Sequence, residues 1–244
     1  MPILTVSPFT TGGNDAFQVI YRGPVNNWTT IRNATTGTGV YTSGNTNPAI
    51  RISAQGGPRG TSYYINRIWA WYDVTGAGLP AGATINSVSL TVATTFSPSS
   101  FPIGDIMIVE GSAFSNNSNA TATTGEFGNL NFNQNYLNSS GTWLNFNGNN
   151  NYTLNSTAEN YISANGLLGV CIIDFQYDFQ DVDPFGGISF DSYNTIDFTN
   201  ASKSSLTVNY TAAGYGNEVN GITAASIGEV NGISSGDINQ VNGL

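Results

Sequence analysis

The chain of 244 residues contains no histidine, one cysteine and only six lysine and arginine residues. Without histidine, Ser-His-Asp catalysis and the usual zinc sites are excluded. The single cysteine, Cys171, has no imidazole to activate it and lies in the apolar run 167–173, so we interpret it as a buried small hydrophobe. There is no P-loop, dinucleotide-binding motif or motif that pairs two carboxylates for glycoside hydrolysis. We therefore expect a protein that is not an enzyme.

Charge is scarce as well, because charged residues make up 9% of the chain and the net charge is −9. Nucleic-acid binding needs a basic face, so we expect no nucleic-acid partner. No apolar run approaches the length of a membrane span, so we expect no membrane partner. Met1 is not followed by the basic and apolar regions of a signal peptide. We expect a chain that was trimmed, exported by another route or released by lysis.

The clearest structural feature is the stretch 63–92. Its first half, 63–72, is apolar at both alternating sets of positions, which is typical of a strand covered on both faces. The Gly/Pro-rich connection 76–82 predicts a turn, at which we expect Asp73 to accept backbone N–H groups. From Val88 onward the second half alternates apolar and polar residues, which predicts a strand with one buried face.

Residues 69–92, WAWYDVTGAGLPAGATINSVSLTV, resemble the core of DNRLRE-type domains, a family of jelly-roll β-sandwiches. The shared pattern is an aromatic-Asp-hydrophobic-Ser/Thr run, here 72–75, followed by LPxGATI, here 79–85. Segments 151–169 and 205–210 are similar to the family's helix with its following strand and to its last strand, so the resemblance covers roughly 48–211. It implies a fold but no single function, because the family occurs in secreted enzymes, surface proteins and phage virion proteins.

The predicted fold is all-β: a jelly-roll-like antiparallel β-sandwich, spanning about 15–211, with one short helix and a C-terminal short-repeat tail. Residues 1–48 are assigned to an N-terminal arm with the first strands, 49–211 to the sandwich, and 212–244 to the tail. The arm includes predicted strands at 17–21 and 28–32, and its YR and WTTIR segments resemble the opening of virion-associated versions of the domain. Ten residues are predicted to be mostly buried: Trp69, Trp71, Val88, Leu90, Ile106, Ile108, Val170, Ile172, Leu206 and Val208.

One helix is predicted over 157–165. Ser156 and Glu159 have the spacing of a capping box, and Gly166 has the position of a left-handed C-cap. Upstream, residues 112–150 are rich in Asn, Ser, Thr and Gly and are predicted to form a long irregular segment. Their spaced aromatic residues either anchor this segment to the sandwich or form a platform for a glycan. The candidate glycan contacts are Phe132, Tyr136 and Trp143.

The acidic residues cluster between 174 and 197. Asp178, Asp181 and Asp183 fall in one predicted loop, and calcium accepts six to eight hard oxygen ligands in loose geometry. Their spacing differs from that of an EF-hand loop. Two interpretations stay open, a calcium site and a solvated acidic loop. Calcium is thus the single cofactor that the sequence suggests.

The tail contains an internal repeat in which Val-Asn-Gly recurs at a spacing of 11 residues, at 219–221, 230–232 and 241–243. We interpret each copy as one helical turn, a glycine reversal and a short extended piece. Units this small do not bury their apolar side alone, so we predict that the repeats dock on other chains rather than form a disordered tail. The predicted assembly residues are Val219, Ile222, Ile227, Val230, Ile233, Ile238, Val241 and Leu244.

Two functions from different classes fit these observations. The first is a structural component of a phage virion, made in the host cytoplasm: a head fibre, decoration or tail-associated protein. Its partners are other virion proteins and copies of itself, as a homo-oligomer, with a trimer favoured if it is a fibre. The tail supports it, since VNG tails resemble the C-termini of tailed-phage structural proteins. The second is an extracellular carbohydrate-binding module or adhesin that binds a host-surface glycan through residues 112–150.

Overall fold

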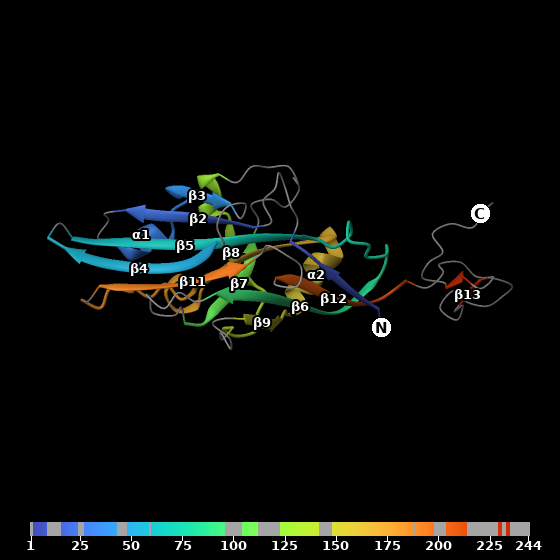
Figure 1. Ribbon diagram of the computed structural model, residues 1–244. Coiled ribbons are helices and arrows are strands. Elements are labelled where there is room, and N and C mark those ends of the chain that lie inside the picture. The colour runs from blue at the N-terminus through green and yellow to red at the C-terminus, as the bar shows by residue number, and fades with distance from the viewer. Residues whose placement is uncertain are drawn as a thin grey trace.

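The structure, a computed structural model, describes residues 2–8, 16–23, 27–42, 48–58, 60–95, 104–111, 123–141, 148–187, 189–197, 204–213, 229–230 and 233–234. In these residues the strands form one twelve-stranded sheet and a separate two-stranded ladder, and they pair antiparallel throughout (Figure 1). This confirms the all-β fold class. No helix in this part of the chain has the length and apolar character needed to cross a membrane.

The strands of the large sheet follow the chain at irregular intervals. They are β1 (Ile3–Val6), β2 (Ala16–Gly23), β3 (Gly39–Thr42), β4 (Ala49–Gly57), β5 (Gly60–Asp73), β6 (Thr84–Thr95), β7 (Ile106–Gly111), β8 (Leu130–Asn135), β9 (Gly148–Thr153), β10 (Leu167–Asp174), β11 (Phe190–Asp197) and β12 (Ser205–Thr211). The short helical segments are α1 (Trp28–Arg32), η1 (Thr124–Gly128), α2 (Ser156–Asn165) and the π-helical η2 (Phe175–Phe179).

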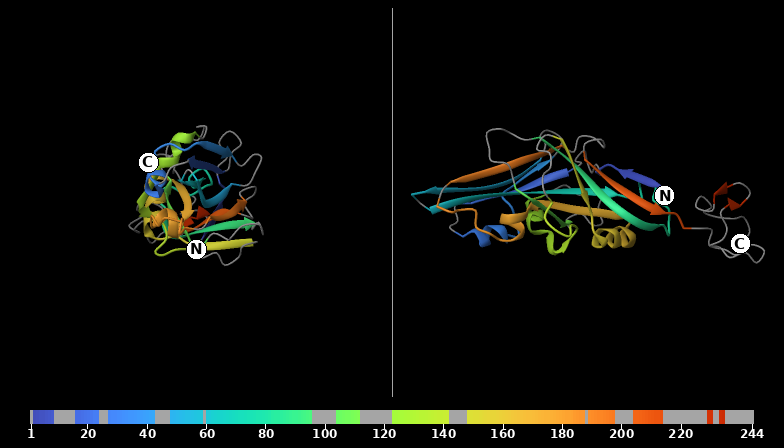
Figure 2. Two further views of the ribbon diagram at one scale, coloured as in Figure 1. Left: turned by 90° about the vertical axis from the view of Figure 1, so that its left-hand side faces the viewer. Right: turned by 90° about the horizontal axis from the view of Figure 1, so that it is seen from below.

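Strand β5 is the centre of the sheet. The order is β1-β12-β6-β11-β4-β5-β10-β7-β8, with β2 also paired to β5 and β9 to β6. The first part of β5 pairs with β4 and its last part with β10, so this one long strand joins two groups of strands. Seen end-on, the strands lie around a common interior, as in a β-sandwich (Figure 2).

The predicted core is largely confirmed, because nine of the ten predicted residues belong to one buried apolar cluster. The exception is Trp71, which is half-buried. It lies opposite Gly169 in the β5–β10 ladder, and a Cβ on that glycine would come within 3.0 Å of the indole ring. The ring therefore covers the glycine instead of pointing into the core.

Strands β5 and β6, which include the two strands predicted in the stretch 63–92, have the predicted burial. On β5 both alternating sets are buried from Ile65 to Ala70. On β6 the apolar positions from Val88 to Val92 are fully buried, whereas the polar residues between them are half-buried. At the turn after β5, the backbone N–H of Gly76 donates to the Asp73 carboxylate over 2.7 Å, which confirms the predicted role of that side chain.

The predicted strand at 28–32 is wrong, because these residues form the short helix α1. Asn27 caps it, since its side-chain oxygen accepts from the backbone N–H of Thr30 over 3.0 Å. Trp28 and Ile31 are both buried, and their spacing of three places them on one side of a helix. An amide cap and one apolar pair thus define an element too short for a periodic pattern.

The predicted helix at 157–165 is confirmed as α2, with one correction at its start. The N-cap is Asn155 and not Ser156, because the Asn155 side chain accepts from the backbone N–H of Thr157 over 3.0 Å. At the other end Gly166 is the predicted left-handed C-cap, with φ of 69°.

The segment 112–150 was predicted to be irregular along its whole length, and this prediction is wrong for part of it. The helical turn η1, strand β8 and the start of β9 lie within it, while 112–122 and 142–147 are outside the described residues. Thr123 and Glu126 form a capping box at η1, with the Thr123 backbone N–H donating to the Glu126 carboxylate over 2.6 Å. In a segment so rich in polar residues, the spacing of Thr123 and Glu126 does not stand out in the sequence.

The tail contributes two described pieces, β13 (Glu229–Val230) and β14 (Ile233–Ser234), which pair only with each other. In this copy Val230 lies opposite Ile233, with two residues between them. Glu229 and Val230 belong to a strand, so the helical turn predicted for each copy does not include these two residues in this repeat.

Candidate functional site

The most polar part of the interior lies where the helical segments cover β5. In the view from below, α1, η1, α2 and η2 lie along one side of the strands (Figure 2). Two residues of β5 on that side contact these segments: Trp28 of α1 packs on Tyr63 with ring centroids 5.5 Å apart, and Trp69 donates over 3.4 Å to the carbonyl of Asn129, the C-cap residue of η1. Between Tyr63 and Trp69 on this face lies Arg67.

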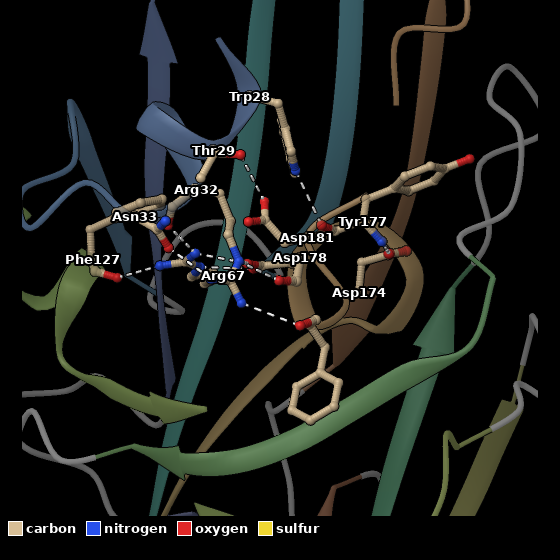
Figure 3. Close-up of polar contacts among 11 residues, drawn as sticks. Trp28, Thr29, Arg32, Asn33, Arg67, Phe127, Asp174, Tyr177, Asp178 and Asp181 are labelled. Atoms are coloured by element: carbon tan, nitrogen blue, oxygen red, sulfur yellow. Dashed lines mark hydrogen bonds and ion pairs between the residues drawn. The ribbon is translucent and has the colours of Figure 1, made fainter. Parts of the chain in front are cut away.

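Arg67 is buried and makes four hydrogen bonds (Figure 3). Its Nε and Nη2 donate to the two carboxylate oxygens of Asp178 over 2.8 and 2.7 Å. Its Nη1 donates to the carbonyl of Phe127 over 2.8 Å, and Nη2 also donates to the carbonyl of Arg32 over 2.6 Å. One side chain therefore links strand β5 to α1, η1 and η2.

Asp178 lies on η2 and is fully buried, with a side-chain exposure of 0%. The two-pronged contact with Arg67 places a carboxylate and a guanidinium in the geometry that such pairs favour. Burial makes the pair costly to break, because either charge left alone would remain desolvated.

Arg32 closes the cluster from the solvent side. Its Nε donates to the carbonyl of Asp178 over 2.6 Å, and its Nη2 donates to the carbonyl of Phe179 over 3.2 Å. Its guanidinium lies 3.7 Å from the centre of the Phe132 ring, a cation–π contact. Burial lowers the pKa of Arg32 from its ordinary value, while the nearby charge of Asp178 acts in the opposite direction.

Asp174 begins the π-helical turn that carries Asp178. Its carboxylate accepts from the backbone N–H of Tyr177 over 2.6 Å, so it caps η2. Burial raises the pKa of Asp174 to about 7, because desolvation penalises the charged form more than the hydrogen bond stabilises it. Asp174 is thus an acidic group that changes charge near neutral pH while it holds η2 in place.

The remaining aspartates of the predicted loop have separate partners. Asp183 accepts from the Tyr63 hydroxyl with both oxygens over 2.9 Å, and it also accepts from the backbone N–H of Phe185 over 2.8 Å. Burial, with a smaller contribution from Asp183, raises the pKa of Tyr63 to about 12. Asp181 accepts from the Thr29 hydroxyl over 3.4 Å and has a positive φ of 57°.

The predicted calcium ligands are therefore not brought together as one set. Asp178 is neutralised by Arg67, whereas Asp181 and Asp183 accept from α1 and β5 respectively. The described residues contain no group of three or more His, Cys, Asp or Glu side chains that could hold a metal ion. Each carboxylate contacts a different element in the structure, and the shared calcium site that the sequence spacing suggested stays a prediction.

The three candidate glycan contacts are also dispersed. Tyr136 is fully buried, so it is corrected from a surface contact to a core residue, and burial raises the pKa of its hydroxyl. Phe132 is half-buried beneath Arg32 and packs on Phe179 with ring centroids 6.5 Å apart. Trp143 lies outside the described residues. The two described aromatic residues thus have the anchoring role that was the other interpretation of this segment.

Of the predicted assembly residues, the structure describes the backbone of Val230 and Ile233, which face each other across the β13–β14 ladder. The other six lie outside the described residues: Val219, Ile222, Ile227, Ile238, Val241 and Leu244.

Sequence reasoning missed both arginines of the buried cluster. The available signal was Arg67 itself, a charged residue in a strand that is apolar on both faces, since a buried arginine requires a carboxylate partner. Six aspartates between 174 and 197, each more than 100 residues away, are possible partners. The sequence therefore does not indicate which of them pairs with Arg67. Chemically, the cluster binds four segments of the same chain together.

No known protein family matches the chain, and no curated protein matches it.

Proposed function

We propose that the chain is a non-enzymatic structural protein of a phage virion that assembles through its C-terminal repeats, as a head fibre, decoration or tail-associated protein. The observation that carries this proposal is the pairing of Val230 with Ile233. It places the apolar positions of one Val-Asn-Gly repeat opposite each other in a hairpin, and the same sequence occurs three times at a spacing of 11 residues.

A hairpin of two-residue strands is too small to persist alone in water, because an isolated two-stranded hairpin is marginal even when longer. Each buried valine or isoleucine side chain contributes roughly 1.5–3 kcal/mol if the repeat docks on another surface. Repetition multiplies this gain without adding a new motif. The tail is therefore better explained as a contact element than as a solvated extension.

The sandwich supports a structural role in a different way. Three aspartates of the acidic segment 174–197 are engaged in holding the fold: Asp178 binds Arg67, Asp183 binds Tyr63, and Asp174 caps η2. The assignment to a virion rests on two resemblances: that of the YR and WTTIR segments at 21–22 and 28–32 to the opening of virion-associated versions of the domain, and that of the Val-Asn-Gly tail to the C-termini of tailed-phage structural proteins.

The test uses the full-length chain with Val219, Val230 and Val241 changed together to Ser, and analytical ultracentrifugation of both proteins. We expect the native chain to sediment as an oligomer and the triple variant as a monomer with an unchanged far-UV circular dichroism spectrum. The matched control is Val182→Ser, which removes an exposed valine elsewhere, 41% exposed, and should leave the oligomer intact. A native chain that sediments as a monomer at all concentrations refutes assembly through the tail.

The virion assignment needs a second measurement. Particles produced by a phage that carries the gene should contain the protein, detectable with an antibody after density-gradient purification. The triple valine variant should be made at the same level and be missing from the particles. Native protein found only in the soluble fraction of the lysate would contradict the virion role.

A further inference from the structure

Strand β1 lies at one end of the strand order and pairs only with β12 in the described part of the chain. The carbonyl of Pro2 accepts from the backbone N–H of Tyr210, which lies directly opposite it, so this pair is of the hydrogen-bonded type. Antiparallel ladders alternate bonded and non-bonded pairs. Ile3 and Thr5 are then the non-bonded positions, and their backbone N–H and C=O groups point away from β12.

The side chains of the same two residues are exposed. Ile3 is 66% exposed, which makes it the more exposed of the two bulky apolar residues on the surface among the side chains that the structure describes. Thr5 is exposed as well. Charges, bulges and a covering segment are among the devices that normally protect a native edge strand, together with proline and a short length. Residues 2–8, PILTVSP, contain no charged residue, and the β1–β12 register is continuous.

We propose that this edge is the docking site for a tail repeat of a second copy of the chain, which adds β14 to the sheet beside β1. The inference rests on the proposed function, since it names the surface that receives the assembling tail. β14 is the favoured strand because its residues, Ile233 and Ser234, are uncharged, whereas β13 carries Glu229.

The size and hydrogen-bond pattern of the hairpin match the edge. Val230 and Ile233 flank a two-residue connection, where the residues next to the turn form the hydrogen-bonded pair. The next pair is non-bonded, so the N–H and C=O of Ser234 point outward from the ladder. They meet the outward groups of β1 at a position next to Ile3, where an apolar repeat residue can cover the exposed side chain.

Two observations favour a second copy as the source. In the part of the chain that the structure describes, β13 and β14 pair only with each other, so this one repeat does not occupy β1 of its own chain. Residues 212–244 carry three acidic and no basic side chains. Tails packed on one another would therefore accumulate like charge, whereas β1 presents none.

Exchange between copies also explains a repeated tail. A contact in which the tail of one copy binds the edge of the next is heterologous, and such contacts close into rings or continue as filaments. Three repeats offer one chain several registers for the same edge, which raises the effective local concentration of docking strands.

The first experiment tests the edge in the full-length protein. Ile3→Lys places a charge on the exposed face of β1, and Thr5→Pro removes an outward N–H without removing a bond to β12. We expect the double variant to raise the dissociation constant of the oligomer at least about tenfold. Val182→Lys is the matched control, because it adds the same charge at an exposed apolar residue of another segment. An oligomer that is equally stable in the double variant and in the control overturns the proposal.

The second experiment identifies the two strands in contact. Cys171 is fully buried, so cysteines introduced as Ile3→Cys and Ser234→Cys on separate chains are the reactive thiols when the two proteins are mixed and oxidised. A disulfide between the two different variants is the expected result. Disulfides only between Ser234→Cys chains, in a native protein that is oligomeric, refute the β1 site and leave tail assembly standing. Disulfides only between Ile3→Cys chains indicate β1–β1 pairing and also refute it. A native monomer refutes the proposed function itself.

Discussion

The buried pair of Arg67 and Asp178 allows a sharp test of how the fold is held together. Asp178→Asn keeps the shape of the side chain and removes its charge. Arginine keeps its charge in proteins, so the Arg67 guanidinium, with a side-chain exposure of 1%, would stay buried without a counter-ion. Breaking a buried ion pair on one side costs about 3–5 kcal/mol, and we expect a loss of that size in the free energy of unfolding.

The chain provides its own control in a second pair of the same chemistry. Arg51 Nε and Nη2 donate to the two oxygens of Asp191 over 2.8 and 2.7 Å, as in the buried pair, but the two side chains are 34% and 36% exposed. Exposed pairs of this kind contribute about 0.2–1 kcal/mol. Asp191→Asn should therefore cost several times less than Asp178→Asn, although each variant replaces a carboxylate that accepts the same two arginine bonds.

A third variant separates charge burial from the other bonds of Arg67. Replacing the pair by Arg67→Met with Asp178→Leu removes both buried charges, which in other buried pairs is often close to neutral. Here it also leaves the carbonyls of Phe127 and Arg32 without their donor, at about 1–3 kcal/mol for each buried group. We expect a loss like that of Asp178→Asn. Urea unfolding followed by tryptophan fluorescence measures all three variants, and equal losses for Asp178→Asn and Asp191→Asn would refute the reasoning.

Three further predictions concern the interior and the assembly. Asp174→Asn keeps an acceptor for the Tyr177 N–H; because folding raises the Asp174 pKa from 3.8 to about 7, the native chain loses stability as pH rises through this range. In urea unfolding, the variant should have the same free energy of unfolding as the native chain at pH 3 and a higher one at pH 8, by up to roughly 4 kcal/mol. Trp71→Ala uncovers Gly169 and should lower the free energy of unfolding, measured in urea, by roughly 3 kcal/mol. A loss below about 1 kcal/mol would place the indole in solvent. Raising NaCl from 0.1 to 1 M should tighten the oligomer in sedimentation, because screening weakens repulsion between copies with a net charge of −9; loosening would indicate ion pairs at the interface.

The sequence predicted those parts of the fold whose signals are local and long enough to repeat. The two-faced strand around Ile65–Ala70 is buried as its pattern indicates, and Gly166 has the backbone angle that a C-cap position requires. Helix α1 was mistaken for a strand because five residues contain a single apolar pair, too few to distinguish a period of three or four from a period of two.

The buried cluster was unpredictable for a different reason. Arg67 is recognisable in the sequence as a charged residue in an apolar strand. Its pairing with Asp178, 111 residues later, depends on how β10 and the π-helical turn direct the Asp178 side chain. The neighbouring aspartates have the same sequence environment and point to Tyr63, to Thr29 and to the start of η2. Spacing alone made them look like a ligand set, whereas three-dimensional direction separates them.

Charge placement connects the stability of the sandwich to the proposed assembly. The three arginines with described side chains, Arg32, Arg51 and Arg67, each lie over an aromatic ring and each contact an aspartate. With six cations in the chain, those three are already committed to the fold and do not attract an acidic tail. A tail with only acidic charges then gains most from a neutral surface with unpaired backbone groups. Among the described residues strand β1 pairs only with β12 and carries no charge, and in our proposal backbone pairing, not electrostatic attraction, is therefore the force that selects the docking site.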